Sequence, residues 1–179
     1  MAGIEYEAKA LEVDPEKVRQ LIDEAGGEQV SDRQLQRRYV YDTIPALVGK
    51  WVRLRDTGQT VTLCVKQILS DEVDGTHETE VVVSDFAEAH ALLQLAGLAP
   101  RTYQENYRTS YRLGAVRLEV DEWPSIPPYL EVEADSEDEV WAAAARLGIA
   151  RESLTSINTT EVYAQYGIDL HAIDSLRFE

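Results

Sequence analysis

The sequence predicts an α+β protein in which about eight antiparallel strands form one sheet system and a few helices flank it. Three observations lead to this prediction. Apolar and ionisable residues alternate with period two over a series of stretches, which is typical of strands with one charged face. Turn residues such as Thr57-Gly58 and Gly114 separate several of these stretches, as hairpins require. Helical periodicity is confined to a few short segments with recognisable starts.

The alternation is clearest from Ile4 to Leu11, where the odd positions begin with Glu5, Glu7 and Lys9 and the even positions are apolar. The same criterion places strands over residues 4–11, 35–42, 51–55, 60–66, 78–83, 103–113, 116–121 and 129–133. Because consecutive strands are joined by short turns, we expect them to pair as antiparallel neighbours.

Helices are expected where a capping residue precedes an apolar stripe. The starts are Asp14-Pro15, Asp85 with Glu88, and Ser136 with Glu139, and a final helix is expected near residues 160–166. Glycine residues after the first three stripes favour the left-handed conformation that ends a helix.

Length and composition bound the functions that are open to the chain. Its 179 residues favour one domain, 1–179, with a core over about 4–148 and a C-terminal helical extension over 149–179. The 33 acidic residues exceed the 17 basic ones and give a net charge of -16, which excludes a broad basic surface for nucleic acid or an anionic membrane. Any polyanionic ligand must therefore be met by a local basic site.

The compartment is indicated by cysteine content and by the amino terminus. A single cysteine, Cys64, cannot form an intramolecular disulfide, and we expect a small buried residue rather than a regulatory thiol. The first residues lack the features of a signal peptide, and no apolar run of about 18 residues could span a membrane. We therefore expect a soluble cytoplasmic protein.

Charged residues are unusually concentrated on the strand faces. The acids on these faces are Glu5, Glu7, Glu78, Glu80, Glu119, Asp121, Glu131 and Glu133, and the bases are Lys9, Arg38, Arg53, Arg55, Lys66, Arg108, Arg112 and Arg117. A half-exposed strand also alternates polar and apolar residues, but solvated faces usually mix in Thr, Ser, Gln and Asn. Here paired Glu residues occupy some strands and paired Arg residues others.

Such faces have a chemical consequence if the sheet closes into a barrel. An eight-stranded barrel is just wide enough for side chains or one small ligand, and buried charges destabilise a fold unless opposite charges neutralise them. Carboxylate pairs suit Mg²⁺ or Mn²⁺, whereas guanidinium groups match phosphate oxygens. The pattern therefore predicts a metal-chelated polyphosphate between acidic and basic strands.

An ordered series of short motifs extends from Ile4 to about Gly148. It comprises Glu5-x-Glu7-x-Lys9, Tyr41-Asp42-Thr43, Arg53-Leu54-Arg55 after Trp51, Lys66, Glu78-Thr79-Glu80, Arg108 with Tyr111, Asp121, and Glu131-Val132-Glu133. This series resembles the CYTH superfamily of triphosphate tunnel metalloenzymes, which is named for a bacterial class IV adenylyl cyclase and thiamine triphosphatase. The resemblance implies an eight-stranded antiparallel β-barrel, open at both ends, that binds a triphosphate inside.

The resemblance also implies roles for individual residues. Phosphates would be held by Lys9, Arg53, Arg55, Lys66 and Arg108, and one or two ions of Mg²⁺ or Mn²⁺ by Glu5, Glu7, Asp121, Glu131 and Glu133. Catalysis would involve Lys9, Glu5 and Glu7, with Glu78 and Glu80 in supporting positions. Two positions differ from many members: Asn106 replaces a lysine and Val40 a tyrosine. Arg38 or Arg112 could restore the lost cation and are included among the substrate-binding candidates.

The leading hypothesis is a divalent-cation-dependent hydrolase of inorganic, nucleoside or thiamine triphosphate. The alternatives are a class IV adenylyl cyclase that converts ATP to cyclic AMP and pyrophosphate, and a noncatalytic module that binds triphosphate or polyphosphate. Asn106 and Val40 motivate the last alternative. No nucleic-acid or membrane partner is expected, and these patterns do not predict an oligomeric state.

Overall fold

The computed structural model describes the backbone of residues 3–69 and 76–179 and the side chains of residues 6–69 and 77–179. The long strands are β1 (Gly3–Ala10), β2 (Glu28–Leu47), β3 (Lys50–Asp56), β4 (Val61–Ile68), β5 (Thr76–Val83), β6 (Pro100–Leu113), β7 (Val116–Glu122) and β8 (Tyr129–Ala134). The helices are α1 (Pro15–Glu24), α2 (Phe86–Leu95), α3 (Glu137–Arg146) and α4 (Thr159–Gln165).

The eight long strands form one antiparallel system with a continuous circuit of neighbours. The order is β6-β2-β3-β4-β5-β1-β8-β7, and β7 pairs in turn with β6. The β1–β5 ladder is short, extending from the Gly3–Glu78 pair to the Glu5–Thr76 pair. The predicted α+β fold with an eight-stranded antiparallel barrel and flanking helices is confirmed in outline.

Capping side chains fix the starts of the helices, as the sequence patterns predicted. Asp14, Asp85 and Ser136 each accept a hydrogen bond from a backbone N–H in the first turn of α1, α2 and α3. The fourth helix begins with a capping box between Asn158 and Glu161. These caps satisfy amide groups that have no partner within the helix.

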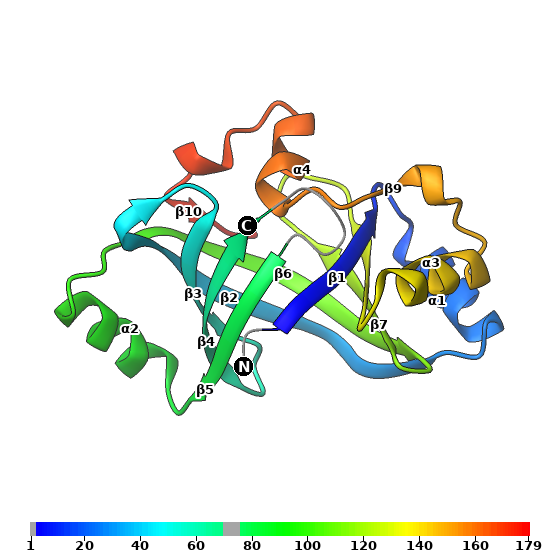
Figure 1. The fold of residues 1–179 in the computed structure, drawn as a ribbon, viewed down its shortest axis with the longest axis horizontal. Helices are drawn as coiled ribbons and strands as arrows, with labels where there is room; N and C mark the ends of the chain where they lie inside the picture. The colour runs from blue at the N-terminus through cyan, green and yellow to red at the C-terminus, as the bar shows by residue number, and fades with distance from the viewer. Residues whose placement is uncertain (1–2, 70–75) are drawn as a thin grey trace.

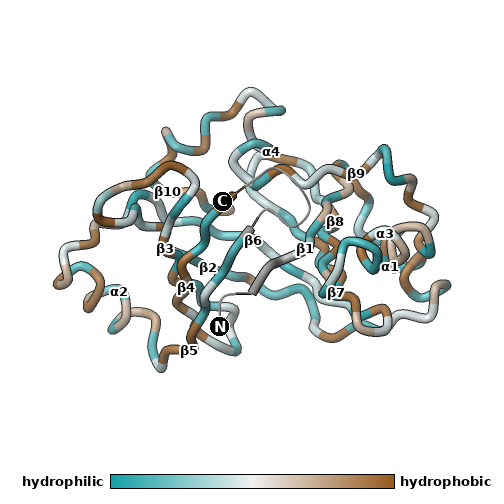
Figure 2. Tube along the Cα trace, viewed as in Figure 1, coloured by the Kyte–Doolittle hydropathy of each residue, from teal (hydrophilic) through white to brown (hydrophobic). Residues whose placement is uncertain are grey.

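The apolar core lies between the sheet and its helices, outside the barrel. Helices α1 and α3 lie side by side at one end of the molecule, and α2 lies at the other (Figure 1). Ile22 and Val140 pack with Leu118 and Val132 of β7 and β8, whereas α2 packs against the outer side of β2 and β3. Hydrophilic and hydrophobic residues are interspersed along the strands (Figure 2), because one side of each strand faces the helices and the other faces inward.

The C-terminal segment is more than a helical extension. It contains α4, two 3₁₀ turns, η1 (Arg151–Ser153) and η2 (Leu170–Ala172), and two short strands, β9 (Leu154–Thr155) and β10 (Ser175–Leu176). Strand β10 pairs in parallel with β6, and Tyr163 and Leu170 pack with Trp123 and Tyr129. The segment is therefore docked against the barrel.

Two further observations concern the start of one strand and the character of the helices. Strand β2 starts at Glu28 rather than near Leu35, because its polar first part is held by pairing with β6. Within residues 3–69 and 76–179, none of the helices has the length and apolar character needed to cross a membrane.

Candidate functional site

The barrel encloses a cavity of about 1460 Å³ that is lined largely by charged side chains. Side chains at alternate positions of the strands point into it, since successive residues of a strand face opposite sides. The ionisable residues that line its wall include Glu7, Lys9, Arg38, Arg53, Arg55, Lys66, Glu78, Glu80, Arg108, Arg117, Glu119, Asp121, Glu131 and Glu133. The interior of this barrel is therefore a charged compartment.

Strands β3, β4 and β5 form a basic wall with two acidic partners. Arg53 donates to Glu78 at 3.0 Å and lies 3.3 Å from Glu80, and Arg55 lies 3.4 Å from Glu80. The ammonium group of Lys66 lies 2.8 Å from Glu78. Glu78 and Glu80 thus hold the bases of this wall by ion pairs.

Guanidinium groups are crowded in the cavity. The charge of Arg53, together with burial, lowers the pKa of Arg55 to about 10. Burial lowers the pKa of Arg38 to about 9, and the charges of Arg53, Arg55 and Arg108 contribute. A negatively charged group placed among these side chains would relieve this repulsion.

Strands β6, β7 and β8 contribute a tighter ion pair. Arg108 donates to both oxygens of Asp121, at 2.7 and 2.5 Å, and its Nη2 lies 3.2 Å from Glu131. Asp121 is fully buried. Although burial opposes ionisation of Arg108, the carboxylate of Asp121 and then that of Glu131 keep the pKa of Arg108 well above its usual range.

Lys9 lies at the junction of β1 and β8 and is almost fully buried. Its ammonium nitrogen lies 2.8 Å from Glu7 and 3.4 Å from Glu131. Burial by itself lowers the pKa of Lys9, but Glu7 and Glu131 outweigh burial and raise it above its ordinary value. In this arrangement Lys9 is a cation at neutral pH rather than a free base.

Carboxylates face one another across β1, β8 and β7. Glu7 is registered with Glu133, and Glu131 with Glu119. Like charges directly opposite on a sheet are destabilising. Burial raises the pKa of Glu119, and its Oε2 atom has no hydrogen-bond partner within the described part of the chain. Arg117 donates to Glu133 but is half exposed.

This carboxylate face, defined here as Glu7, Glu119, Asp121, Glu131 and Glu133, has the donor chemistry of a hard-cation site. In this structure Lys9, Arg108 and Arg117 pair with most of its oxygens, and a cation would have to replace them. The face presents only oxygen donors, which Mg²⁺ and Mn²⁺ prefer, and a cation would relieve the two like-charged pairs. The unpartnered oxygen of Glu119 is the clearest sign, because a buried carboxylate oxygen without a partner is costly.

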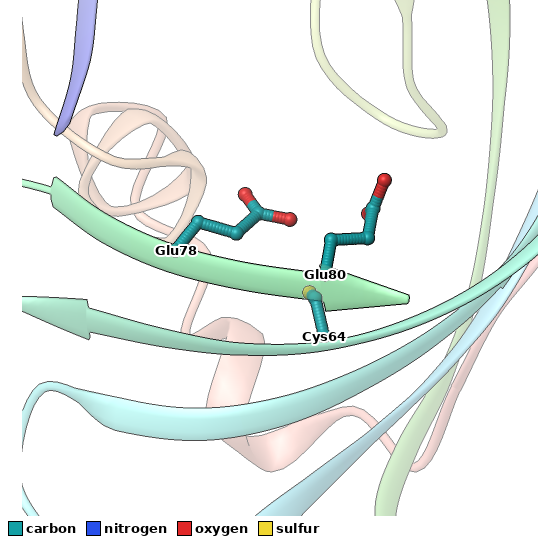
Figure 3. Close-up of side chains that lie close together, drawn as sticks. All are labelled: Cys64, Glu78 and Glu80. Carbon is teal, nitrogen blue, oxygen red and sulfur yellow. The ribbon is translucent and has the colours of Figure 1, made fainter. Parts of the chain in front are cut away.

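A second acidic group has ligand atoms that lie close together but includes a thiol. Over the described residues, the metal-type ligand atoms that lie within 4.8 Å of one another belong to Cys64, Glu78 and Glu80. Figure 3 shows the two glutamates extending from β5 beside Cys64 of β4. Burial raises the pKa of Cys64 to about 11, so its thiol stays protonated at neutral pH, whereas thiols bind metals as thiolates. The two glutamates are also bound to Arg53, Arg55 and Lys66.

The structure brings most of the predicted site residues together, with two exceptions. Arg112 shares the parity of Arg108, but it is exposed near the end of β6, opposite Arg117, and does not line the cavity. Glu5 lies in β1, but its side chain is outside the described residues.

Several cavity residues received no role from the sequence. Glu119 was recognised as an acid on a strand face, and its register with Glu131 is what marks it as a candidate ligand. Trp123, Gln104 and the residues from Asn158 to Glu161 also line the cavity. Parity could have identified Gln104, since it alternates with Asn106 and Arg108, but no local pattern placed the C-terminal segment there.

Comparison with solved structures shows the same fold in several proteins. A conserved hypothetical protein from Pyrococcus furiosus has a TM-score of 0.73 at 23% identity, covering 88% of this chain and 98% of that one. A candidate adenylate cyclase from Vibrio parahaemolyticus has a TM-score of 0.77 at 14% identity, covering 92% and 99%. A candidate adenylyl cyclase from Hippeastrum, described as having a dominant triphosphatase activity, has a TM-score of 0.56 at 18% identity, covering 93% and 96%.

Sequence comparisons identify a family but no individual curated relative. No curated protein matches the chain significantly. The model of the CYTH domain matches residues 3–160, which is most of the chain and includes all eight long strands. The chain therefore belongs to the CYTH domain family.

Proposed function

We propose that this protein is a divalent-cation-dependent enzyme that binds a triphosphate in the barrel cavity and hydrolyses it. The observation that carries the proposal is the gathering of Arg38, Arg53, Arg55 and Arg108 around one cavity, where burial lowers the pKa of Arg38 and the charge of Arg53 lowers that of Arg55. A fold that buries like-charged groups gains stability when a polyanion binds between them. A triphosphate supplies several negative charges in a small volume.

The two sides of the cavity suit the two parts of a metal-bound triphosphate. Arg53, Arg55, Lys66 and Arg108 are the candidate phosphate ligands, because guanidinium and ammonium groups donate to phosphate oxygens. The carboxylate face would hold Mg²⁺ or Mn²⁺, with Glu5 of β1 as a further candidate ligand. When bound, such a cation neutralises phosphate charge and favours transfer of a phosphoryl group.

Binding would exchange ion-pair partners rather than create isolated charges. In this structure Arg108 is paired with Asp121 and Arg53 with Glu78. With metal and triphosphate bound, carboxylates would pair with the cation while guanidinium groups pair with phosphate. Because both states are neutralised, the exchange avoids the cost of an unpaired buried ion.

Hydrolysis is favoured over cyclisation by one comparison. The triphosphatase activity described for the Hippeastrum protein supports hydrolysis. The charged residues recognise the phosphate chain alone, so inorganic triphosphate, ATP and thiamine triphosphate are all candidate substrates. Lys9, Glu5 and Glu7 remain the proposed catalytic group, with Lys9 acting as a cation that orients Glu7 and Glu131.

Product analysis tests the proposal. Purified protein is incubated with Mg²⁺ or Mn²⁺ and each triphosphate, and phosphate, pyrophosphate and cyclic AMP are resolved by ion-exchange chromatography. We expect phosphate release that EDTA abolishes and that Arg53→Met impairs, whereas the exposed control Arg112→Met leaves it unchanged. Pyrophosphate with cyclic AMP would instead identify a cyclase. Tight triphosphate binding without any product would identify a noncatalytic module, and neither binding nor product would overturn the proposal.

A further inference from the structure

Among the described residues, Arg38 differs from the other arginines of the cavity in having no acidic ion-pair partner. Arg53, Arg55 and Arg108 each lie within 3.4 Å of at least one carboxylate. Arg38 is buried on β2 and lines the same cavity, yet it makes no ion pair with any described residue. A buried cation without an ion-pair partner costs free energy, and of the described carboxylates Asp121 acts on Arg38 without contacting it, so the retention of Arg38 favours a bound anion.

Arg38 is held in place by uncharged groups, which do not neutralise its positive charge. Its Nη2 donates to the Oδ1 of Asn106, and the amide nitrogen of Asn106 donates to Asp121 at 2.9 Å. The guanidinium carbon lies 4.6 Å from the centre of the Trp123 ring, which favours a cation over its face. The side chain is therefore fixed between an amide and an indole.

Donors beside this position have no acceptor. Within the described residues, neither Nε of Arg38 nor Nε1 of Trp123 has a hydrogen-bond partner, and both atoms are buried. Both residues line the cavity. Two buried donors without acceptors, next to a positive charge that has no ion-pair partner among the described residues, form the environment that a phosphate oxygen would complete.

The neutrality of position 106 is a condition for this arrangement. Arg38 is registered with Gln104, and Asn106 lies one inward position further along β6. Because Arg38 bonds directly to the side chain of Asn106, a lysine there would place two cations in contact at a buried site. An amide accepts from Arg38 on one side and donates to Asp121 on the other, so it connects a base and an acid that do not otherwise pair.

We propose that Arg38 is a phosphate-binding residue of the cavity and that Asn106 is the positioning residue that aims it. This inference rests on the proposed function, since it assigns Arg38 to the triphosphate bound there. It also separates Arg38 from Arg112, which lies outside the cavity and is exposed. Arg38 on β2 thus supplies the positive charge that a lysine at position 106 of β6 would have supplied.

Calorimetric titration with sodium tripolyphosphate in EDTA tests the inference without dependence on metal or turnover. Removing one charge-assisted contact is expected to weaken binding about tenfold or more in Arg38→Met. Arg38→Lys is expected to recover part of the affinity, because it restores the charge but not the planar donor group. Arg112→Met is the matched control and is expected to bind like the wild type.

Thermal unfolding distinguishes a ligand-binding role from a structural one. Arg38→Met removes an uncompensated buried charge, so its melting temperature without ligand is expected to equal or exceed that of the wild type. A structural arginine would give the opposite result. Loss of affinity together with retained stability therefore supports the inference, whereas a lower melting temperature with unchanged affinity overturns it.

A double variant tests the positioning role of Asn106. Asn106→Leu is expected to weaken tripolyphosphate binding in the wild-type background and to have no further effect in Arg38→Met, because the amide acts through Arg38. Additive losses would overturn that role. In a second arm, Arg38→Met with Asn106→Lys moves the cation to β6 and is expected to restore most of the affinity. Wild-type binding with no effect of Arg38→Met would overturn this inference alone. No wild-type binding, either in EDTA or with Mn²⁺ in place of EDTA, would overturn the proposed function as well.

Discussion

Replacing Asp121 by asparagine should reveal how strongly the stability of the fold depends on pairing of the buried charges in the cavity. Asp121 is fully buried and accepts two hydrogen bonds from Arg108 and one from Asn106. The amide of Asp121→Asn keeps one oxygen acceptor but loses the negative charge. Removing one partner of a buried pair costs about 3–5 kcal/mol, and we expect about 3 kcal/mol because Glu131 still lies near Arg108.

For a domain of this size, that loss corresponds to a decrease of roughly 6–12 °C in melting temperature. Scanning calorimetry in EDTA measures it. Removing both charges, in Asp121→Asn with Arg108→Met, should recover much of the loss, since buried ion pairs contribute little net stability over neutral replacements. Asp23→Asn breaks an exposed pair with Arg19 and is the matched control, with little change expected. Internal neutralisation would not be stabilising if Asp121→Asn melted like the control, or if the double variant lost the sum of the single changes.

Three further predictions concern the other charged groups of the cavity. Arg53→Met and Arg55→Met should each raise KM for tripolyphosphate about tenfold or more while changing kcat less, and steady-state kinetics would contradict this if kcat alone fell. Glu119→Gln should raise the melting temperature of the metal-free protein at neutral pH. Burial raises the pKa of Glu119 in the folded state, so the ionised carboxylate destabilises the fold fully above that pKa and less as the pH falls below it. The increase in melting temperature caused by Glu119→Gln should therefore become smaller in acid. An increase that is constant with pH would contradict the burial of an ionised Glu119. Burial also raises the pKa of Cys64 to about 11, so iodoacetamide should modify the folded protein slowly at pH 8, whereas rapid complete modification detected by mass spectrometry would contradict this burial.

The sequence patterns predicted the strands and the sides they present, because alternation is a local property of a strand. Whether a residue has an odd or an even position predicts which face of the sheet it lies on, but not how far along the barrel it lies. Arg108 and Arg112 have the same parity, yet only Arg108 reaches the cavity, since Arg112 lies near the turn between β6 and β7. That distinction requires the strand register, which is set by tertiary pairing.

Other features depend on contacts between distant segments and left no local pattern. The first part of β2 is polar and exposed, so its strand conformation comes from pairing with β6 rather than from burial of one face. Asn106 could be recognised only as a missing charge, because its bond to Arg38 joins β6 to β2. The approach of Asn158 and His171 to the cavity likewise results from docking of the C-terminal segment.

We propose that the two charged sides of the barrel together bind one metal-bound triphosphate. A crystal structure of the protein with Mn²⁺ and a nonhydrolysable triphosphate analogue tests this most directly, with the ion located by anomalous scattering. We expect an Mn²⁺ peak at the carboxylate face, with phosphate oxygens on Arg53, Arg55 and Arg108. A peak at Cys64, Glu78 and Glu80, or a triphosphate bound outside the cavity, would contradict the proposal.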